Sequence, residues 1–372
     1  MQKILIVFGT RPEAIKMAPL IKEFEKCSDL FTLKVCVTAQ HREMLDQVLN
    51  FFGINADFDL NLMRPGQNLF QLTSDVILGV KAVLEDFKPD FVFVHGDTTT
   101  SMASSLAAFY SQIAVCHVEA GLRTNNLQSP FPEELNRQIT GRIAQYHFAP
   151  TKESAANLYK ENVSIDRVIV TGNSVIDALL FTKEKLSFYE DSEIIKLKSL
   201  IDINKRLIVV TGHRRENFGS GFIEICEALK EIALNEDVQI IYPVHLNPNV
   251  QEPVNAILQG VPNILLIAPL GYPAFSWLMS KAYLILTDSG GIQEEAPSLG
   301  KPVLVMRDNT ERPEAVEAGT VILVGTDKMK IVKECNDLLM DLDKYNSMSK
   351  LHNPYGDGYA CERIVNFIKT LK

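Results

Sequence analysis

The chain has 372 residues, of which 46% are hydrophobic and 22% are charged, and its formal net charge is -9. This length predicts two domains of ordinary α/β size, and the composition is that of a soluble globular protein. The negative charge argues against a nucleic-acid partner, because surfaces that bind nucleic acids usually carry a basic stripe.

The cysteines and the apolar segments indicate a cytoplasmic protein. The six cysteines are scattered and form no C-x-x-C pair, which favours a reduced compartment over a disulfide framework or a zinc site. The apolar run at residues 1–9 is too short for a signal peptide and predicts a buried strand. The most apolar longer window, 264–279, is broken by Pro269, Gly271 and Pro273, so we expect no membrane span.

Short apolar runs alternate with helical patterns along the whole chain, which is typical of βαβ units and parallel sheets. The strands expected in the first half are residues 4–8, 33–38, 91–95, 114–118, 147–149 and 168–171. Amphipathic helices are expected between them, for example at residues 14–26, 67–87 and 100–110. The strands expected in the second half are residues 207–211, 239–244, 264–268, 282–287, 303–306 and 320–324.

A polar, charged stretch with helical spacing, residues 181–205, separates the two sets of strands. We therefore predict an α/β protein of two doubly wound domains, at residues 1–170 and 171–357, with the second binding a nucleotide. The last segment, 358–372, predicts a helix that packs back on the first domain. Because ligands bind outside the carboxyl ends of parallel strands, the expected binding site is a central cleft between the domains.

Polar clusters follow several of the expected strands. The first lies at residues 9–16, where Pro12 favours the start of a helix. This places Arg11 at the N-terminus of the helix and Lys16 about one turn further. No good match to G-x-G-x-x-G occurs, so a dinucleotide cofactor has weak support. In the cluster at residues 212–217, His213 and two arginines directly after a strand favour anion binding over a solvated charge run.

Asp97 and Glu119 follow two successive expected strands, each two residues after a histidine, His95 and His117. One interpretation is a metal site with histidine and carboxylate ligands. The other is acid–base chemistry by carboxylates in a cleft of low dielectric constant. For either histidine alone, a structural role at the end of a strand is favoured.

Glu133 and Glu134 add a carboxylate pair at the start of a helix, where the helix dipole favours acidic residues whatever the function. Arg312 precedes a proline-started helix, and it either holds a diphosphate or pairs with Glu295 or Glu314.

The turn Ser289-Gly290-Gly291 lies between an expected strand and a helical pattern. Free backbone N–H groups at such a turn bind anions, most often phosphate. Glu294 and Glu295 follow on the first helical turn, where a hydroxyl of an attached sugar would fall. The alternative is a tight turn in which the glycines only allow the backbone conformation and bind no ligand.

Six motifs together resemble the non-hydrolysing UDP-N-acetylglucosamine 2-epimerases of bacteria. They lie, in order and with matching spacing, at residues 9–13, 95–98, 119–123, 132–137, 212–217 and 288–295. The resemblance implies the glycosyltransferase-B architecture, in which two Rossmann-like domains surround a cleft. It also implies the reversible conversion of UDP-N-acetylglucosamine to UDP-N-acetylmannosamine.

This reaction explains why carboxylates are needed rather than a cofactor. The C2–H of the sugar is not next to a carbonyl, so its direct deprotonation is too unfavourable. The resemblance implies elimination of UDP to a 2-acetamidoglucal and re-addition on the other face, with no cofactor and no metal. By similarity the catalytic residues are Asp97, Glu119, Glu133 and His213, and which carboxylate is the acid and which the base stays open.

Similarity also assigns the substrate-binding positions. Arg11, Lys16 and His213 would stabilise charge on the departing diphosphate, and Asp97 and Glu119 would also contact the substrate. The remaining positions are Ser289, Gly290 and Gly291 for phosphate oxygens, Glu295 for the ribose, and Phe275 and Arg312 near the nucleotide. Leu270 departs from the pattern, because some members carry a glutamine there that touches the uracil.

Some relatives are activated by a second UDP-N-acetylglucosamine. The matching positions here are Gln40, His41, Glu43, Met44 and Arg64, which makes allosteric activation a hypothesis. A homodimer is the default expectation, and the sequence does not assign the polysaccharide pathway that uses the product.

Four other functions stay open. They are a glycosyltransferase-B type sugar transferase, a hydrolysing 2-epimerase, a sugar-nucleotide sensor without turnover, and a metal-dependent hydrolase that uses His95, Asp97, His117 and Glu119.

Overall fold

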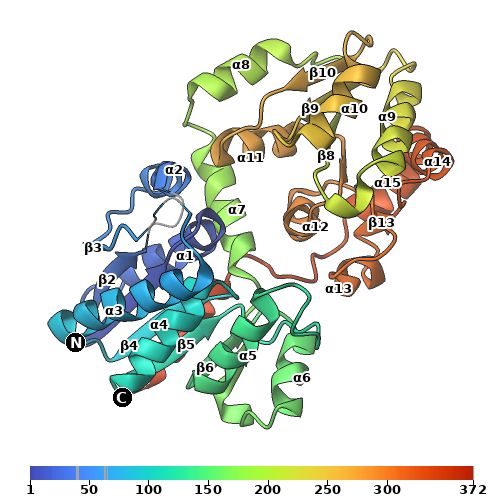
Figure 1. Cartoon of the computed structure of the whole chain (residues 1–372). Coiled ribbons are helices and arrows are strands. Elements are labelled where there is room, and N and C mark those ends of the chain that lie inside the picture. Colours follow the sequence, from blue (N-terminus) through green and yellow to red (C-terminus); the bar gives the residue numbers. More distant parts are fainter. Residues whose placement is uncertain (39–41, 63, 65, 372) are drawn as a thin grey trace. The chain divides into compact units, whose positions relative to one another are not determined.

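The chain divides into two compact units, which are described separately (Figure 1). The computed structural model describes residues 1–38, 42–62, 64 and 66–371. The first unit comprises residues 1–180 and 355–372, and the second comprises residues 181–354. The expected boundary at residue 170 falls before this division, because one helix, α7 (Ser174–Lys185), continues across it.

The described part of the first unit contains a seven-stranded parallel sheet with the strand order β3-β2-β1-β4-β5-β6-β7. Its strands are β1 (Gln2–Phe8), β2 (Phe31–Val37), β3 (Phe58–Asp59), β4 (Phe91–His95), β5 (Ala114–Val118), β6 (Tyr146–Ala149) and β7 (Val168–Val170). Strands β1 and β4 are buried on both faces, apart from the first two residues of β1, which is why they read as continuous apolar runs.

Helices cover both faces of this sheet. They are α1 (Arg11–Glu25), α2 (Arg42–Phe52), α3 (Leu69–Phe87), α4 (Thr99–Tyr110), α5 (Glu133–Ile143), α6 (Lys152–Lys160) and α16 (Ala360–Thr370), with a short 3-10 turn at Ile165–Arg167. Helices α3 and α4 pack over Leu5, Val7 and Val92. On the other face the ring of Phe24 from α1 meets Phe93 edge-on at a centroid distance of 5.4 Å.

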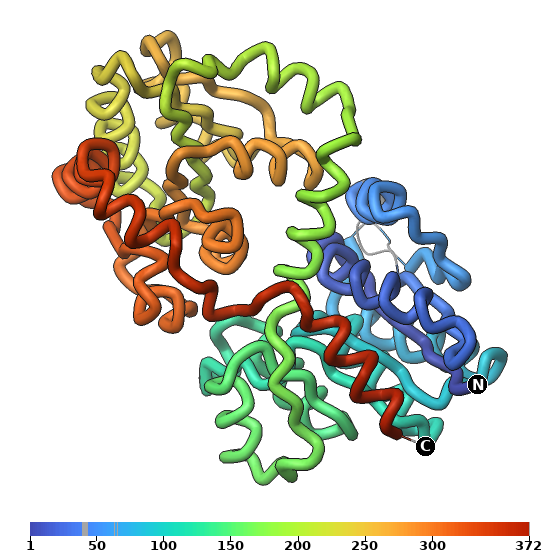
Figure 2. Tube along the Cα trace, turned by 180° about the vertical axis from the view of Figure 1, so that it is seen from behind, coloured from blue at the N-terminus to red at the C-terminus, as the bar shows by residue number. Residues whose placement is uncertain are grey.

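The C-terminal helix α16 belongs to the first unit although it follows the second in sequence. It packs against α1, and Figure 2 shows it in red beside the strands of the first unit. Phe367 meets the rings of Tyr146 and Phe148 on β6 at 5.3 and 5.8 Å. A buried carboxylate of α7 caps the helix, since Asp177 accepts hydrogen bonds from the backbone N–H groups of Ala360 and Cys361.

The described part of the second unit contains a six-stranded parallel sheet with the order β10-β9-β8-β11-β12-β13. The strands are β8 (Arg206–Thr211), β9 (Val238–Pro243), β10 (Ile264–Ile267), β11 (Leu284–Thr287), β12 (Val303–Val305) and β13 (Val321–Leu323). The helices are α8 (Ser192–Leu200), α9 (Ser220–Ile232), α10 (Pro248–Leu258), α11 (Tyr272–Lys281), α12 (Gly290–Glu295), α13 (Pro313–Glu317), α14 (Lys328–Met340) and α15 (Leu342–Ser349), with 3-10 turns at Arg215–Asn217 and Ala296–Leu299.

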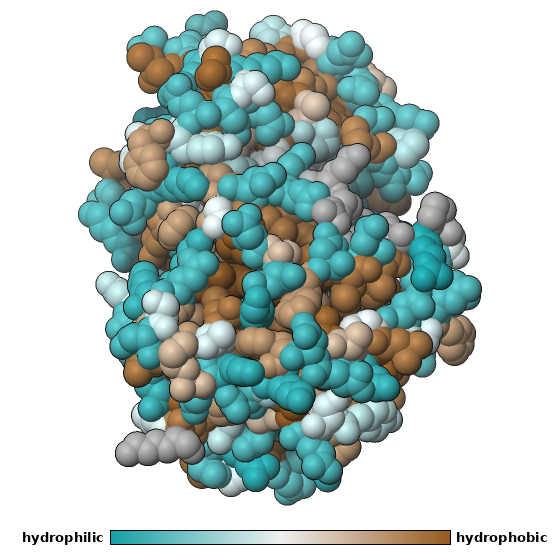
Figure 3. Space-filling view, turned by 90° about the vertical axis from the view of Figure 1, so that its left-hand side faces the viewer, coloured by the Kyte–Doolittle hydropathy of each residue, from teal (hydrophilic) through white to brown (hydrophobic). Residues whose placement is uncertain are grey.

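Every strand expected from the sequence is present, and the expected polar stretch contains the end of α7 and the helix α8. Strand β3 was not expected, because two residues are too few to show a pattern. None of the described helices is both long and apolar enough to cross a membrane. In Figure 3 hydrophobic residues are interspersed among hydrophilic ones, which is ordinary for a protein surface.

Because Asp177 caps α16, we predict that its carboxylate holds the C-terminal helix in place. Replacing Asp177 with alanine leaves two backbone N–H groups of the helix without their acceptor, which costs on the order of 1–3 kcal/mol. We expect a lower thermal unfolding midpoint and faster hydrogen exchange in residues 360–370. Asp357→Ala is the matched control, because it removes an exposed carboxylate that pairs with Arg363, and such pairs contribute at most about 1 kcal/mol. Unchanged exchange in α16 of Asp177→Ala would contradict the assignment.

Candidate active site

In each sheet, polar clusters follow the two strands between which the strand order reverses. The strand order reverses between β1 and β4 in the first unit and between β8 and β11 in the second. In open α/β sheets ligands bind beyond the carboxyl ends of the strands at such a reversal. Residues 9–16 and 95–99 follow the first pair of strands, and residues 212–217 and 288–291 follow the second.

A buried carboxylate, Glu13, joins the two turns of the first unit. Its Oε2 accepts hydrogen bonds from the backbone N–H groups of Gly9 at 3.0 Å and Thr10 at 2.8 Å. Its Oε1 accepts from the hydroxyls of Thr98 at 2.6 Å and Ser101 at 3.0 Å. This clamp fixes the start of α1, with Arg11 as its first residue and Lys16 about one turn further, as the sequence predicts.

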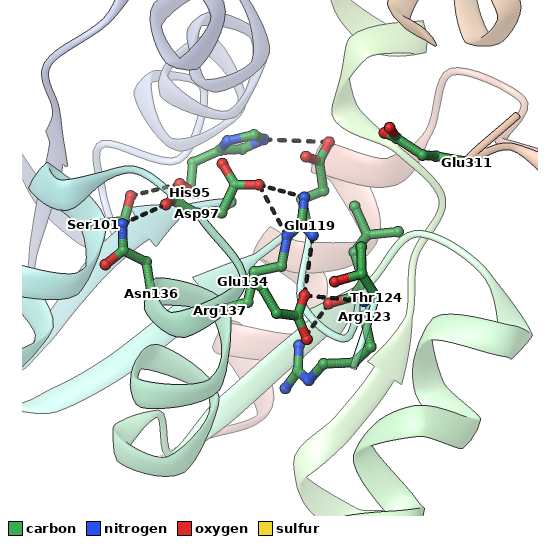
Figure 4. Close-up of polar contacts among 12 residues, drawn as sticks. His95, Asp97, Ser101, Glu119, Arg123, Thr124, Glu134, Asn136, Arg137 and Glu311 are labelled. Atoms are coloured by element: carbon green, nitrogen blue, oxygen red, sulfur yellow. Dashed lines mark hydrogen bonds and ion pairs between the residues drawn. The ribbon is translucent and has the colours of Figure 1, made fainter. Parts of the chain in front are cut away.

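Glu119 directly follows β5 and contacts groups from other segments of the unit. It forms an ion pair with Lys16, and its Oε2 accepts a hydrogen bond from Asn173 Nδ2 at 3.0 Å. His95 Nε2 lies 3.7 Å from the same oxygen (Figure 4). The backbone of Glu119 has φ 61°, a left-handed conformation that is uncommon for a residue other than glycine and that concentrates at functional sites. The carboxylate is therefore fixed at a strained turn.

Asp97 lies in the same network and is held by an arginine. Its Oδ2 accepts from Arg137 Nε at 2.9 Å and lies 2.7 Å from Arg137 Nη2, while Asn136 Nδ2 donates to its backbone carbonyl at 2.9 Å (Figure 4). Burial raises the pKa of Asp97, the Arg137 guanidinium opposes this increase, and the charge of Glu119 adds to it. Two carboxylates with different partners thus meet within one buried cluster.

The adjacent residues Glu133 and Glu134 have different environments. The side chain of Glu134 is fully buried and accepts hydrogen bonds from the backbone of Thr124 at 3.0 Å and Asn125 at 3.1 Å, and from Arg137 at 3.2 Å. It therefore holds the loop before α5. Glu133 is half-buried, and its Oε2 is buried with no hydrogen-bond partner among the described residues.

The two histidines before these carboxylates are buried. His117 Nε2 lies 2.7 Å from the carbonyl of Gly96, which indicates a structural role. Burial lowers the pKa of His117 to about 3 and that of His95 to about 4. Within residues 1–38, 42–62, 64 and 66–371, no group of three or more His, Cys, Asp or Glu side chains is placed to hold a metal ion.

In the second unit a turn rich in cations follows β11. A Cβ built on Gly290 would lie 3.9 Å from Arg214 Nη2 and 4.0 Å from Arg312 Nη2, so two guanidinium groups border the turn. The backbone N–H of Ser289 donates to Thr287 Oγ1 at 2.9 Å. Arg312 forms an ion pair with the buried Glu294, a partner that the sequence did not indicate.

His213 follows β8 at the same edge. Its ring stacks against His245 at a centroid distance of 5.5 Å, and its Nδ1 lies 3.4 Å from Asp288 Oδ1. Burial lowers the pKa of His213, while the charge of Asp288 opposes this shift. Glu295 ends α12, and the half-buried Phe275 lies in the first turn of α11, which follows β10.

The positions assigned to a second nucleotide sugar are described only in part. Gln40 and His41 lie outside the described residues, and the side chain of Glu43 is likewise not described. Met44 is on α2 and exposed, and the exposed Arg64 lies 3.6 Å from Asp75. Allosteric activation and the homodimer stay predictions.

Comparisons with known proteins identify the family. A family model for UDP-N-acetylglucosamine 2-epimerase matches residues 23–369. The UDP-N-acetylglucosamine 2-epimerase of Escherichia coli K12 is 61% identical over 99% of this chain and 98% of its own length, and that of Campylobacter jejuni is 58% identical over 99% and 97%. The chain belongs to the UDP-N-acetylglucosamine 2-epimerase family.

Solved structures agree with this family. The UDP-GlcNAc 2-epimerase of Neisseria meningitidis, solved with UDP-GlcNAc bound, is 53% identical, with a TM-score of 0.90 over 99% of this chain and 100% of its own. A putative UDP-N-acetylglucosamine 2-epimerase from Listeria monocytogenes has a TM-score of 0.92 and 49% identity over 99% and 96%. The predicted class, two parallel-sheet α/β domains of the glycosyltransferase-B type, is confirmed.

Three residues of this epimerase-family chain were given no role from the sequence although they contact assigned residues. Arg137 holds Asp97, Asn173 holds Glu119, and Asp288 faces His213. Each stands beside or within a polar motif at a strand end or helix start, which is the signal available in the sequence. Their partners come from other segments, so the pairing is visible only in the fold.

The buried histidines predict how stability depends on pH. An unfolded histidine takes up a proton near its usual pKa of 6.5, whereas folded His117 resists protonation down to about pH 3. The unfolded state therefore binds more protons between these values, and stability is lost as the pH falls below 6.5. His117→Gln should make the unfolding free energy less dependent on pH, by at most about 1.4 kcal/mol per pH unit.

The measurement is chemical unfolding between pH 4.5 and 7.5. His352→Gln is the control, because this ring is exposed in the folded protein and should leave the slope unchanged. An equal slope for the wild type and His117→Gln would show that burial of this ring does not govern the acid sensitivity.

Proposed function

We propose that the chain catalyses the reversible conversion of UDP-N-acetylglucosamine to UDP-N-acetylmannosamine by elimination and re-addition of UDP. One observation supports this most directly in a member of the epimerase family. Two partly buried carboxylates, Asp97 after β4 at the strand-order reversal and Glu119 after the neighbouring β5, share one cluster, and each is held by a cation, Arg137 or Lys16. Neighbouring acids with different surroundings are what proton removal and return on two faces of a sugar require.

The proposed steps balance without an oxidant. A carboxylate removes the C2 proton while the C1–O bond breaks, and UDP departs with that electron pair to leave a 2-acetamidoglucal. A proton then returns to C2 on the opposite face, and a diphosphate oxygen of UDP attacks C1. We assign proton transfer at C2 to Asp97 or Glu119 with assistance from Glu133, whose buried Oε2 has no hydrogen-bond partner among the described residues.

The departing UDP carries negative charge that must be stabilised. We assign this role to Arg11, Lys16 and His213. The turn at Ser289, Gly290 and Gly291 is assigned to the phosphates, and the guanidinium groups beside Gly290 support an anion there. Glu295, Phe275 and Arg312 are assigned to the rest of the nucleotide by similarity.

The experiment that tests the reaction is incubation with UDP-N-acetylglucosamine in D2O, followed by proton NMR. We expect UDP-N-acetylmannosamine with deuterium at C2, because the removed proton exchanges with solvent before it returns. Free N-acetylmannosamine with UDP would favour a hydrolysing epimerase instead. Recovery of unlabelled substrate alone would contradict the proposal and favour a sensor, and turnover that requires an added acceptor would favour a sugar transferase.

The two carboxylates predict the largest losses of activity. Asp97→Asn and Glu119→Gln should each lower kcat at least ~100-fold, because each removes a positioned acid or base. Steady-state rates and the rate of deuterium incorporation measure the effect, and circular dichroism checks that the variants fold. Glu85→Gln on α3 is the matched control, since this carboxylate is exposed. A loss below about 10-fold in both variants would remove these residues from the chemistry.

A further inference from the structure

Asp288 is a fully buried carboxylate at the strand-order reversal of the second unit. It follows β11, and its backbone N–H donates to the carbonyl of Thr211 at the end of β8, at 3.2 Å. Its Oδ2 accepts hydrogen bonds from the backbone N–H groups of His213 at 2.8 Å and Arg214 at 2.7 Å. One oxygen of this side chain therefore holds the turn that carries His213.

The other oxygen has a different environment. Oδ1 of Asp288 is buried and has no hydrogen-bond partner among the residues that the structure describes. It lies 3.4 Å from Nδ1 of His213, whose side chain is 43% exposed and whose ring stacks against His245. A buried acceptor without a donor is costly, and a proton on Nδ1 is the group positioned to reduce that cost.

We propose that Asp288 is the positioning residue of His213, which it holds with a proton on Nδ1 so that Nε2, once it is protonated as well, donates to the leaving diphosphate. This inference rests on the proposed function. When Nε2 also carries a proton, the carboxylate stabilises the imidazolium, as the aspartate of a Ser-His-Asp triad does. The cation Arg214 and the ring of His245 act in the opposite direction on His213, so without Asp288 little would favour a charged ring.

A purely structural role for Asp288 is the competing explanation, since Oδ2 also supports the turn. Asp288→Asn separates the two roles. The asparagine carbonyl oxygen can still accept from the N–H groups of His213 and Arg214, but its NH₂ group then faces Nδ1 and favours the proton on Nε2. The turn is retained, whereas the imidazolium loses its counter-charge and its Nδ1–H loses its acceptor.

The first test is a double-mutant cycle on UDP-N-acetylglucosamine turnover. We expect Asp288→Asn to lower kcat about 10- to 100-fold with KM changed less than about 3-fold, the scale of losing an oriented proton-transfer group. In the His213→Gln background the same substitution should have almost no further effect, because the two residues act as one unit. Equal losses in both backgrounds would show a structural role and overturn the inference. Asp191→Asn, which removes a helix-capping carboxylate of the same unit, is the matched control.

The second test requires neither turnover nor a folded Asp288 variant. Nitrogen-15 NMR of the histidine-labelled full chain reports the tautomer, and His213→Gln identifies the resonances. Wild-type His213 with its proton on Nδ1 supports the inference, and a proton on Nε2 in the neutral ring overturns it. If the D2O experiment finds no epimerisation, the proposed function fails while this spectrum still decides the pairing.

Discussion

The reversal of strand order in each sheet is the constraint on which the rest of this structure depends. At the reversal the connections leave toward opposite faces, so the carboxyl ends of two neighbouring strands remain open to a ligand. The strands themselves are buried and apolar, as β4 shows throughout. The polar residues of the candidate site are therefore found just beyond the strand ends, in the turns that begin at Gly9, Gly96, Gly212 and Asp288.

Carboxylates at such positions lose water and must be compensated, and this protein does so in two ways. Glu13 receives hydrogen bonds from backbone N–H groups and hydroxyls and holds a loop in place, whereas Glu134 combines backbone N–H donors with Arg137. Asp97 and Glu119 instead face cations, Arg137 and Lys16. At Asp97 the charge of Arg137 opposes the rise in pKa that burial causes.

The fold followed from the sequence because parallel strands buried on both faces are continuous apolar runs, and Pro12 correctly marked the start of α1. The pairing within the site did not follow in the same way. Glu133 and Glu134 are neighbours, and the rotation of about 100° between them on α5 decides which is buried in the loop and which is not. Asn173 reaches Glu119 across 54 residues of sequence, a contact that no local pattern reports. The two units divide at residue 180, inside α7, where the helical pattern of the sequence has no break.

The two units share a structural feature that the sequence does not show, namely a turn held by a buried carboxylate. In each, a buried carboxylate accepts from two successive backbone N–H groups of the turn after the central strand: Glu13 from Gly9 and Thr10, and Asp288 from His213 and Arg214. The second oxygen of Glu13 is occupied by two hydroxyls, so Glu13 is complete as a clamp. That of Asp288 faces only an imidazole at 3.4 Å among its described ion-pair partners. Clamping the turn needs one oxygen, and the other lies beside the imidazole ring. This difference between the units is why we propose Asp288 as the positioning residue of His213.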